Sequence, residues 1–108
     1  MARTQITLPY EASRAVQALG QNLRTARLRR NMTLEEVAGR IGVHRETLAM
    51  AEKGNPNVSM GTYVGALWVL GLTNDLLAVA DPERDRVGQS LESRRERART
   101  PQGLSNDF

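Results

Sequence analysis

The sequence of 108 residues predicts an all-α fold. Apolar residues recur every three or four positions, and capping residues or glycines bound each such stretch. Aromatic residues make up only 4% of the chain, so the core has to be built from Leu, Val, Ala and Met, which suits packed helices better than packed sheets. We expect one small domain of five helices over residues 10–80, a short extension over residues 1–9 and a charged tail over residues 81–108.

The N-terminal extension is expected to be an arm or a short strand. Ile6 and Leu8 share one face of the segment TQITL, but a strand of this length is marginal unless it pairs with a partner. Pro9 favours a helix start directly after it. A helix over residues 10–30 follows, with one apolar stripe made of Val16, Leu19, Leu23 and Ala26.

Residues 32–54 carry the most informative pattern, MTLEEVAGRIGVHRETLAMAEKG. Thr33 followed three residues later by Glu36 is a capping box, so a short helix opens there and runs to residue 41. Gly42 ends this helix, because a residue that tolerates positive φ turns the chain sharply.

A second short helix follows over residues 44–53, where Leu48 and Ala51 repeat the apolar spacing and Gly54 closes the helix. Ala38 is small at the point where the two helices would cross. Two short helices joined by a glycine turn form a helix-turn-helix.

Two further helices are expected before residue 81. Ser59 caps the fourth, Gly71 closes it, and its apolar stripe consists of Met60, Val64, Leu67 and Leu70. The fifth, over residues 75–80, is almost entirely apolar. A short helix that is apolar all round is not covered by one packing face, so a second protomer or a partner should cover the rest.

The composition changes after Pro82. Residues 89–99 could form a charged helix, but Leu91 is the only large apolar residue in it. We expect a solvated tail. The alternative is a segment that folds on binding DNA, a second protomer or another protein.

Composition excludes several classes of function. The chain has no cysteine, and His44 is its only histidine, so disulfides, metal sites and histidine-based catalytic pairs are not expected. With no nucleophile and base to assemble, we expect no enzyme and no cofactor. No apolar run approaches the roughly 20 residues that cross a bilayer, and no signal peptide is recognisable. We therefore expect a cytoplasmic protein without membrane contact.

The charge distribution favours a nucleic-acid partner. Of the 15 basic residues, 14 are Arg, and residues 1–80 carry the whole net charge of +3. The planar guanidinium suits phosphate and guanine, although Arg is also common in proteins from GC-rich genomes. The positive charge thus coincides with the helix-turn-helix.

Residues 19–79 resemble the lambda-repressor-like domain of the Xre family. The family has an Arg-rich first helix, a Thr-capped second, a recognition helix ending in Glu-x-Gly, and a fourth helix with a Pro/Ser start. The corresponding segments here are LRTARLRRNMTLEEVAGRIGV, HRETLAMAEKG and NPNVSMGTYVGALWVLGL. Within this family, residues 54–88 are most similar to a HipB-like antitoxin.

The resemblance implies a five-helix, lambda-repressor-like domain that binds a palindromic operator in double-stranded DNA as a homodimer and represses transcription. A HipB-like antitoxin would also belong to a type II toxin–antitoxin pair, autoregulate its operon and neutralise a HipA-like kinase toxin. The alternative is a stand-alone phage-type repressor or controller protein without a toxin partner.

Four residues of the recognition helix match the family's base-reading positions. Arg45 would hydrogen-bond guanine O6 and N7, and Glu46 would accept from cytosine N4 or orient Arg45. Ala49 and Met50 would touch a thymine methyl group. The alternative is that all four are ordinary surface residues.

Seven residues are candidate phosphate ligands: Thr33, His44, Lys53, Arg24, Arg29, Arg30 and Arg40. His44 stands where the family usually has a capping Ser or Thr, so either the helix start is less stable or the ring contacts a phosphate. Leu34 stands where many members carry a phosphate-binding Gln. Arg27 and Glu52 match a family pair that joins the first and third helices, so we expect them to be structural.

Five apolar residues are candidates for an isologous dimer interface: Trp68, Leu72, Leu76, Leu77 and Val79. Trp68 could instead be a partly buried core residue. A two-fold dimer would place two recognition helices roughly 34 Å apart, one turn of DNA.

Overall fold

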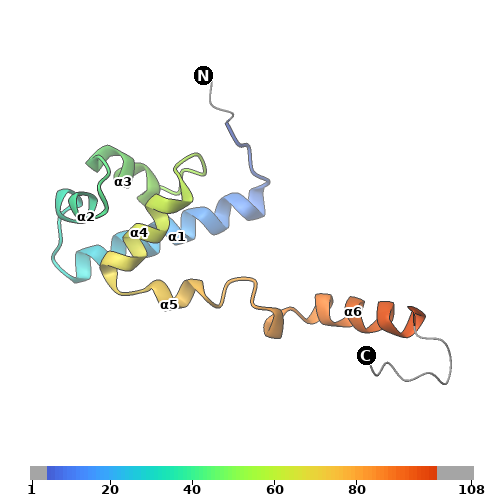
Figure 1. Ribbon diagram of the computed structural model, residues 1–108. Coiled ribbons are helices and arrows are strands. Elements are labelled where there is room, and N and C mark those ends of the chain that lie inside the picture. The colour runs from blue at the N-terminus through green and yellow to red at the C-terminus, as the bar shows by residue number, and fades with distance from the viewer. Residues whose placement is uncertain (1–4, 100–108) are drawn as a thin grey trace. The chain divides into compact units, whose positions relative to one another are not determined.

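The computed structural model describes residues 5–99, in which the regular elements are helices and no strand is present (Figure 1). The all-α class is therefore confirmed. The elements are α1 (Tyr10–Arg29), α2 (Leu34–Ile41), α3 (Arg45–Glu52), α4 (Met60–Leu70), α5 (Thr73–Leu76), the 3-10 helix η1 (Pro82–Arg84) and α6 (Arg86–Arg99). The chain divides into two compact units, one ending at Asn74 and one beginning at Asp75. In the described part, no helix has the length and apolarity to span a membrane.

The first unit is built from α1 to α4, which pack around one apolar core (Figure 1). Its most deeply buried large side chains are Leu23 on α1, Val37 on α2 and Leu48 on α3, each 1% exposed. Leu23 and Leu48 lie on the apolar stripes that the spacing predicts for their helices. The helix periodicity therefore identified the buried faces of α1 and α3.

The buried face of α4 differs from the predicted stripe. Met60 is 67% exposed and Val64 is half-buried, whereas Tyr63 and Ala66 are buried. The Tyr63 hydroxyl donates to the Asn55 carbonyl oxygen at 2.7 Å, and burial raises the pKa of Tyr63. Tyr63 thus joins α4 to the loop after α3. The spacing of apolar residues in α4 does not predict this contact.

Gly20 is a packing residue within α1, which runs without interruption from Tyr10. A Cβ atom at this position would lie 2.5 Å from the Ala51 carbonyl oxygen and 2.7 Å from that of Glu52. Glycine therefore permits the backbones of α1 and α3 to come this close. The helix propensity that Gly20 lowers is outweighed by the contact that it allows.

The N-terminal arm is not a strand in the part described, residues 5–9. The Ile6 N–H donates to the Asn57 side-chain oxygen at 2.8 Å. Ile6 and Leu8 line an apolar surface hollow together with Val16, Leu19, Pro56, Val58, Met60 and Tyr63. The arm thus lies along its own domain. Residues 1–4 of the expected extension lie outside the described residues.

The fifth helix is shorter than predicted, and residues 77–80 form turns. Val79 N–H donates to the Leu76 carbonyl oxygen at 3.1 Å, three residues back, and Ala80 has φ of 59°. Leu77 and Val79 are 76% and 67% exposed, so packing does not support a helix here. The Asp81-Pro82 sequence also disfavours helical geometry before the proline.

The tail contains more regular structure than the favoured prediction of a solvated segment. α6 begins at Arg86, three residues before the predicted position, because the Asp85 carboxylate accepts from the Gly88 N–H at 2.9 Å and caps the helix. None of its residues is buried. Residues 100–108 of the expected tail lie outside the described residues.

Candidate nucleic-acid interface

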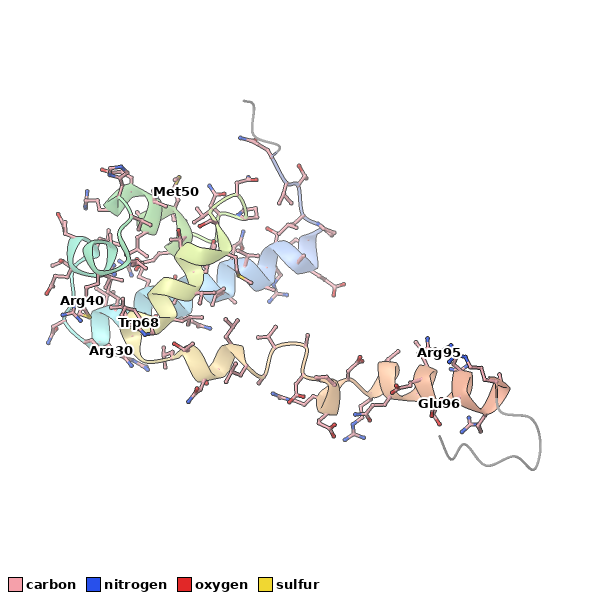
Figure 2. All side chains as sticks on the ribbon, in the orientation of Figure 1. Arg30, Arg40, Met50, Trp68, Arg95 and Glu96 are labelled. Carbon is pink, nitrogen blue, oxygen red and sulfur yellow. The ribbon has the colours of Figure 1, made fainter. Side chains whose placement is uncertain are left out.

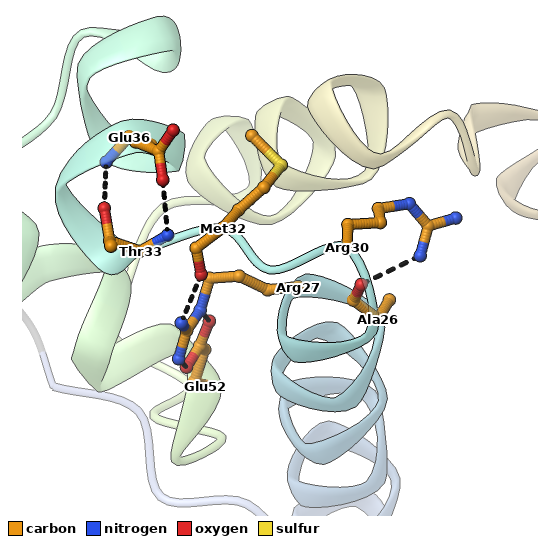
Figure 3. Close-up of polar contacts among 7 residues, drawn as sticks. All are labelled: Ala26, Arg27, Arg30, Met32, Thr33, Glu36 and Glu52. Atoms are coloured by element: carbon orange, nitrogen blue, oxygen red, sulfur yellow. Dashed lines mark hydrogen bonds and ion pairs between the residues drawn. The ribbon is translucent and has the colours of Figure 1, made fainter.

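The start of α2 is held by the predicted capping box. Glu36 N–H donates to Thr33 Oγ1 at 3.0 Å, and Thr33 N–H donates to Glu36 Oε1 at 2.9 Å (Figure 3). These two bonds satisfy backbone donors at both residues. The Thr33 hydroxyl group still has a hydrogen to donate, and the first backbone amides of an α-helix have no acceptor within the helix itself.

The turn between α2 and α3 is tight. Gly42 has φ of 84°, in the left-handed region. Both Gly42 N–H and Val43 N–H donate to the Ala38 carbonyl oxygen, at 2.9 and 3.0 Å. Ala38 itself is 1% exposed, and Ala51 on α3 is fully buried. Small side chains at the crossing therefore let α2 and α3 pack as a helix-turn-helix.

α3 begins at Arg45, with His44 as the N-terminal capping residue. The His44 side chain makes no capping hydrogen bond, as the substitution of the usual Ser or Thr predicts. The His44 carbonyl oxygen accepts from Leu48 N–H at 3.2 Å. The exposed imidazole is therefore not needed to hold the helix.

A buried ion pair fixes the other end of α3. Arg27 Nε lies 2.7 Å from Glu52 Oε2, and Arg27 Nη2 lies 2.9 Å from Glu52 Oε1. Arg27 Nη1 also donates to the Met32 carbonyl oxygen at 2.9 Å (Figure 3). The hydrogen bond to Glu52 raises the pKa of Arg27. Both residues are more than 90% buried, which confirms that they are structural.

The four predicted base-reading residues lie on α3. Arg45, Glu46 and Met50 are exposed, and Ala49 is half-buried. They face away from the core side of the helix, which buries Leu48 and Ala51. Met50 projects at the surface in Figure 2. The first turn of α3 thus presents a cation and a carboxylate to the solvent.

Glu35 is a site residue that the sequence analysis missed. Its Oε2 lies 3.6 Å from Arg45 Nε, and the two side chains are 69% and 51% exposed. The sequence offers Glu46, the next residue on the same helix, as a residue that could orient Arg45. Glu35 lies on α2, ten residues earlier, and becomes a neighbour only because the two helices cross.

A family model described as a helix-turn-helix domain matches residues 18–80, more than half of the chain. The chain belongs to this helix-turn-helix family. No curated protein and no solved structure matches it. The match begins in the middle of α1 and ends four residues after α5, so α6 lies outside it.

The helix-turn-helix domain brings some of the phosphate candidates together at a polar surface hollow. The residues that line it come from α1, α2 and α3 or directly follow α3: Gln17, Gln21, Arg24, Arg27, Leu34, Ala49, Glu52 and Lys53. Arg24 and Lys53 therefore border the same depression as Ala49. Gln17 and Gln21 are exposed amides that the sequence analysis missed, and their spacing with Arg24 along α1 was the available signal.

The remaining phosphate candidates do not line this hollow. Arg30 and Arg40 lie in a different part of the helix-turn-helix domain from Met50 (Figure 2). Arg30 Nη1 donates to the Ala26 carbonyl oxygen at 2.8 Å (Figure 3), so this guanidinium caps the end of its own helix. Arg29, next to it, is exposed.

The candidate dimer residues are distributed over both units. In the first unit Trp68 is 66% exposed and is not part of the core, while Leu72 is half-buried. In the second unit Leu77 and Val79 are mostly exposed, and Leu76 is half-buried. Each unit therefore carries apolar surface of its own.

Proposed function

We propose that this helix-turn-helix protein is a sequence-specific transcriptional repressor that binds double-stranded DNA and has no catalytic activity. The observation that carries the proposal is the exposed face of α3. It presents Arg45, Glu46 and Met50 on a helix that is held at one end by the Gly42 turn and at the other by Arg27 and Glu52.

Base recognition would begin at the N-terminal end of α3, the part of a recognition helix that enters the major groove. Arg45 would donate two hydrogen bonds to guanine O6 and N7, and Glu46 would accept from cytosine N4. Met50 and the half-buried Ala49 would contact thymine methyl groups. A rigid helix matters here, because a bidentate contact requires the guanidinium in one orientation.

Phosphate contacts would surround this helix and set its register on the duplex. Arg24 and Lys53, which line the polar hollow, are candidates on one side, and His44 is a candidate at the start of α3. Thr33 and the amides of the first turn of α2 would hold another phosphate oxygen. These groups carry no sequence information themselves.

A two-fold dimer would read both halves of a palindromic operator. We propose Trp68 as an interface residue, because an indole that is 66% exposed can bury a large apolar area against a second protomer. Trp68→Ser should dissociate the dimer, as measured by light scattering during size-exclusion chromatography. Met60→Ser is the matched control, since Met60 lies on the same helix and is 67% exposed.

The repressor proposal is tested by selecting duplexes from a random pool with the wild-type protein. We expect a palindromic site. Arg45→Ala should weaken binding to that site by about 1–3 kcal/mol and relax one base pair in each half. Arg14→Ala removes an exposed Arg that stacks on Tyr10 and should leave the selected site unchanged. Failure of the wild type to enrich any sequence would contradict the proposal.

We further propose that the protein is the antitoxin of a type II toxin–antitoxin pair, which represses its own operon and neutralises a HipA-like kinase toxin. Support comes from the resemblance over residues 54–88 and from Leu77 and Val79, which are largely exposed and lie outside the DNA-reading helices. These side chains are suited to an apolar contact with a partner protein.

The antitoxin proposal is tested by recovering the tagged protein from its native host and identifying bound proteins by mass spectrometry. A stoichiometric kinase-like partner is expected. The double variant Leu77→Ser, Val79→Ser should lose the partner and stay dimeric in light scattering, which separates a toxin contact from the dimer contact that the sequence predicts for these residues. Recovery of the chain with only its own copies and DNA would instead support a stand-alone repressor or controller protein.

A further inference from the structure

The last helix has a strongly uneven charge. α6 has 14 residues, none of them buried. Its first eight residues, 86–93, contain one Arg and one Glu and have no net charge. Its last six, 94–99, contain four Arg and one Glu, a net charge of +3. We call residues 94–99 the Arg-rich end of α6.

Local contacts define where α6 begins. The Asp85 carboxylate accepts from the Gly88 N–H at 2.9 Å, and a side chain at Gly88 would collide with that carboxylate. Gln89 Nε2 donates to the Pro82 carbonyl oxygen at 2.8 Å. An isolated helix of this length is marginally stable in water. These contacts therefore stabilise the start of a helix whose side chains do not pack into a core.

The arrangement of the Arg side chains suits an extended anionic surface. At 100° per residue, Arg94 and Arg97 lie on one side of the helix and Arg95 and Arg99 on another. The four Arg side chains therefore cover about 200° of the helix circumference and do not form one narrow stripe. The large apolar side chains, Val87 and Leu91, are 72% and 52% exposed and lie in the uncharged half.

A second copy of α6 is a poor partner for this surface. Pairing two such helices side by side in the same direction would place two ends of charge +3 against each other. Duplex DNA carries one negative charge per roughly 1.7 Å of its axis. The helix-turn-helix domain of the same chain would hold that polyanion nearby.

We propose that the Arg-rich end of α6 binds the phosphates of the duplex that flanks the site read by α3. The inference rests on the proposed DNA-binding function and adds a second, sequence-independent contact outside the family match. It assigns α6 to DNA, whereas the toxin contact proposed above uses residues 77 and 79.

The chain is long enough for this contact. Residues 75–85 span at most about 40 Å if fully extended, and 14 helical residues add about 21 Å. The Arg-rich end therefore stays within about 60 Å of the helix-turn-helix domain, which corresponds to roughly 18 base pairs at 3.4 Å each. A tether of this length keeps the local concentration of the helix in the millimolar range.

The test compares two full-length variants. In the first, Arg94, Arg95, Arg97 and Arg99 are all replaced by Gln, and in the second by Lys, which keeps the charge. Circular dichroism checks that both retain their helix content. Each protein is titrated with the selected site as a short duplex and with the same site carrying 20 base pairs of flanking DNA on either side, over a range of salt concentrations.

We expect the wild type to bind the flanked duplex roughly tenfold more tightly than the short one at low salt. The slope of log K against log salt should be steeper on the flanked duplex by up to about 3 for each α6 that binds. The Lys variant should keep both differences, and the Gln variant should lose both.

An equal ratio of flanked to short affinity in the wild type and the Gln variant would overturn the inference. A tail that binds an acidic protein groove would give that result. Binding to the short duplex tests the proposed function alone, because that duplex has no flank for α6 to contact. Failure of the α6 inference can therefore be distinguished from failure of the proposed function. If no site is selected, random duplexes of the two lengths still measure the contribution of α6.

Discussion

α2 and α6 are both short, charged helices that begin at a capping side chain, yet only α2 is part of a core. α2 has eight residues and buries Val37 and Ala38. α6 has 14 residues and buries none. Its two large apolar residues, Val87 and Leu91, are too few to form a packing face. A cap therefore starts a helix, whereas the number and spacing of apolar residues decide whether it packs.

The comparison also separates two ways of contacting DNA. The α2–α3 pair is held by the Gly42 turn and the Arg27–Glu52 ion pair, so its exposed side chains have the defined positions that the proposed reading of base edges requires. α6 can supply positive charge to phosphates, which requires no such precision. Packing is thus the physical requirement for the base specificity that we propose.

The largest effect should come from breaking the buried ion pair. Arg27→Ala leaves the Glu52 carboxylate buried without its partner and should lower the free energy of unfolding by about 3–5 kcal/mol. Urea denaturation measures this change. Arg29→Ala removes an exposed Arg from the same helix and should change stability by less than about 0.5 kcal/mol. Equal effects of the two variants would contradict a structural role for the pair.

The close contact between α1 and α3 can be tested with two glycines. Gly20→Ala places a Cβ atom against the carbonyl oxygens of Ala51 and Glu52 and should destabilise the domain by about 1–3 kcal/mol. Gly39→Ala, in α2, meets no atom within 4 Å and should stabilise it by about 0.5–1 kcal/mol. Thermal and urea unfolding measure whether each substitution raises or lowers the free energy of unfolding. Stabilisation by both substitutions would show that Gly20 is not needed for packing.

Removing the capping side chain should have different effects on α2 and α6. Thr33→Ala should lower the free energy of unfolding by about 1 kcal/mol, because α2 is part of the cooperative core. Asp85→Ala should reduce the helix signal of α6 in circular dichroism while the unfolding midpoint stays the same. A lower midpoint for Asp85→Ala would mean that α6 contributes to the stability of the first unit.

The smallest effect concerns Glu35 and Arg45. An exposed ion pair of this kind is worth about 0.2–1 kcal/mol. If α3 binds DNA as proposed, Glu35→Gln should raise affinity for random DNA, because it removes a negative charge beside α3, and should reduce discrimination at the base pair proposed for Arg45. A double-mutant cycle with Arg45→Ala measures the coupling. Additive effects of the two substitutions would show that Glu35 does not position Arg45.

Much of the helix-turn-helix could be predicted because its signals are local. The capping box at Thr33 and the left-handed turn at Gly42 depend on residues within one or two turns of each other. The family pattern then related Arg27 to Glu52. The prediction was wrong where the structure depends on packing between helices. α5 ends earlier than predicted, and α4 buries Tyr63 and exposes Met60.

The helix class, the two-helix motif and the positively charged end of α6 follow from composition, caps and periodicity, because these act over a few residues. The need for Gly20 at the α1–α3 contact, the exposure of Trp68 and the proximity of Glu35 to Arg45 follow from the folded arrangement of the helices. These features depend on the distance and angle at which helices cross. Both are set by the packing of whole side chains, which residue spacing does not contain.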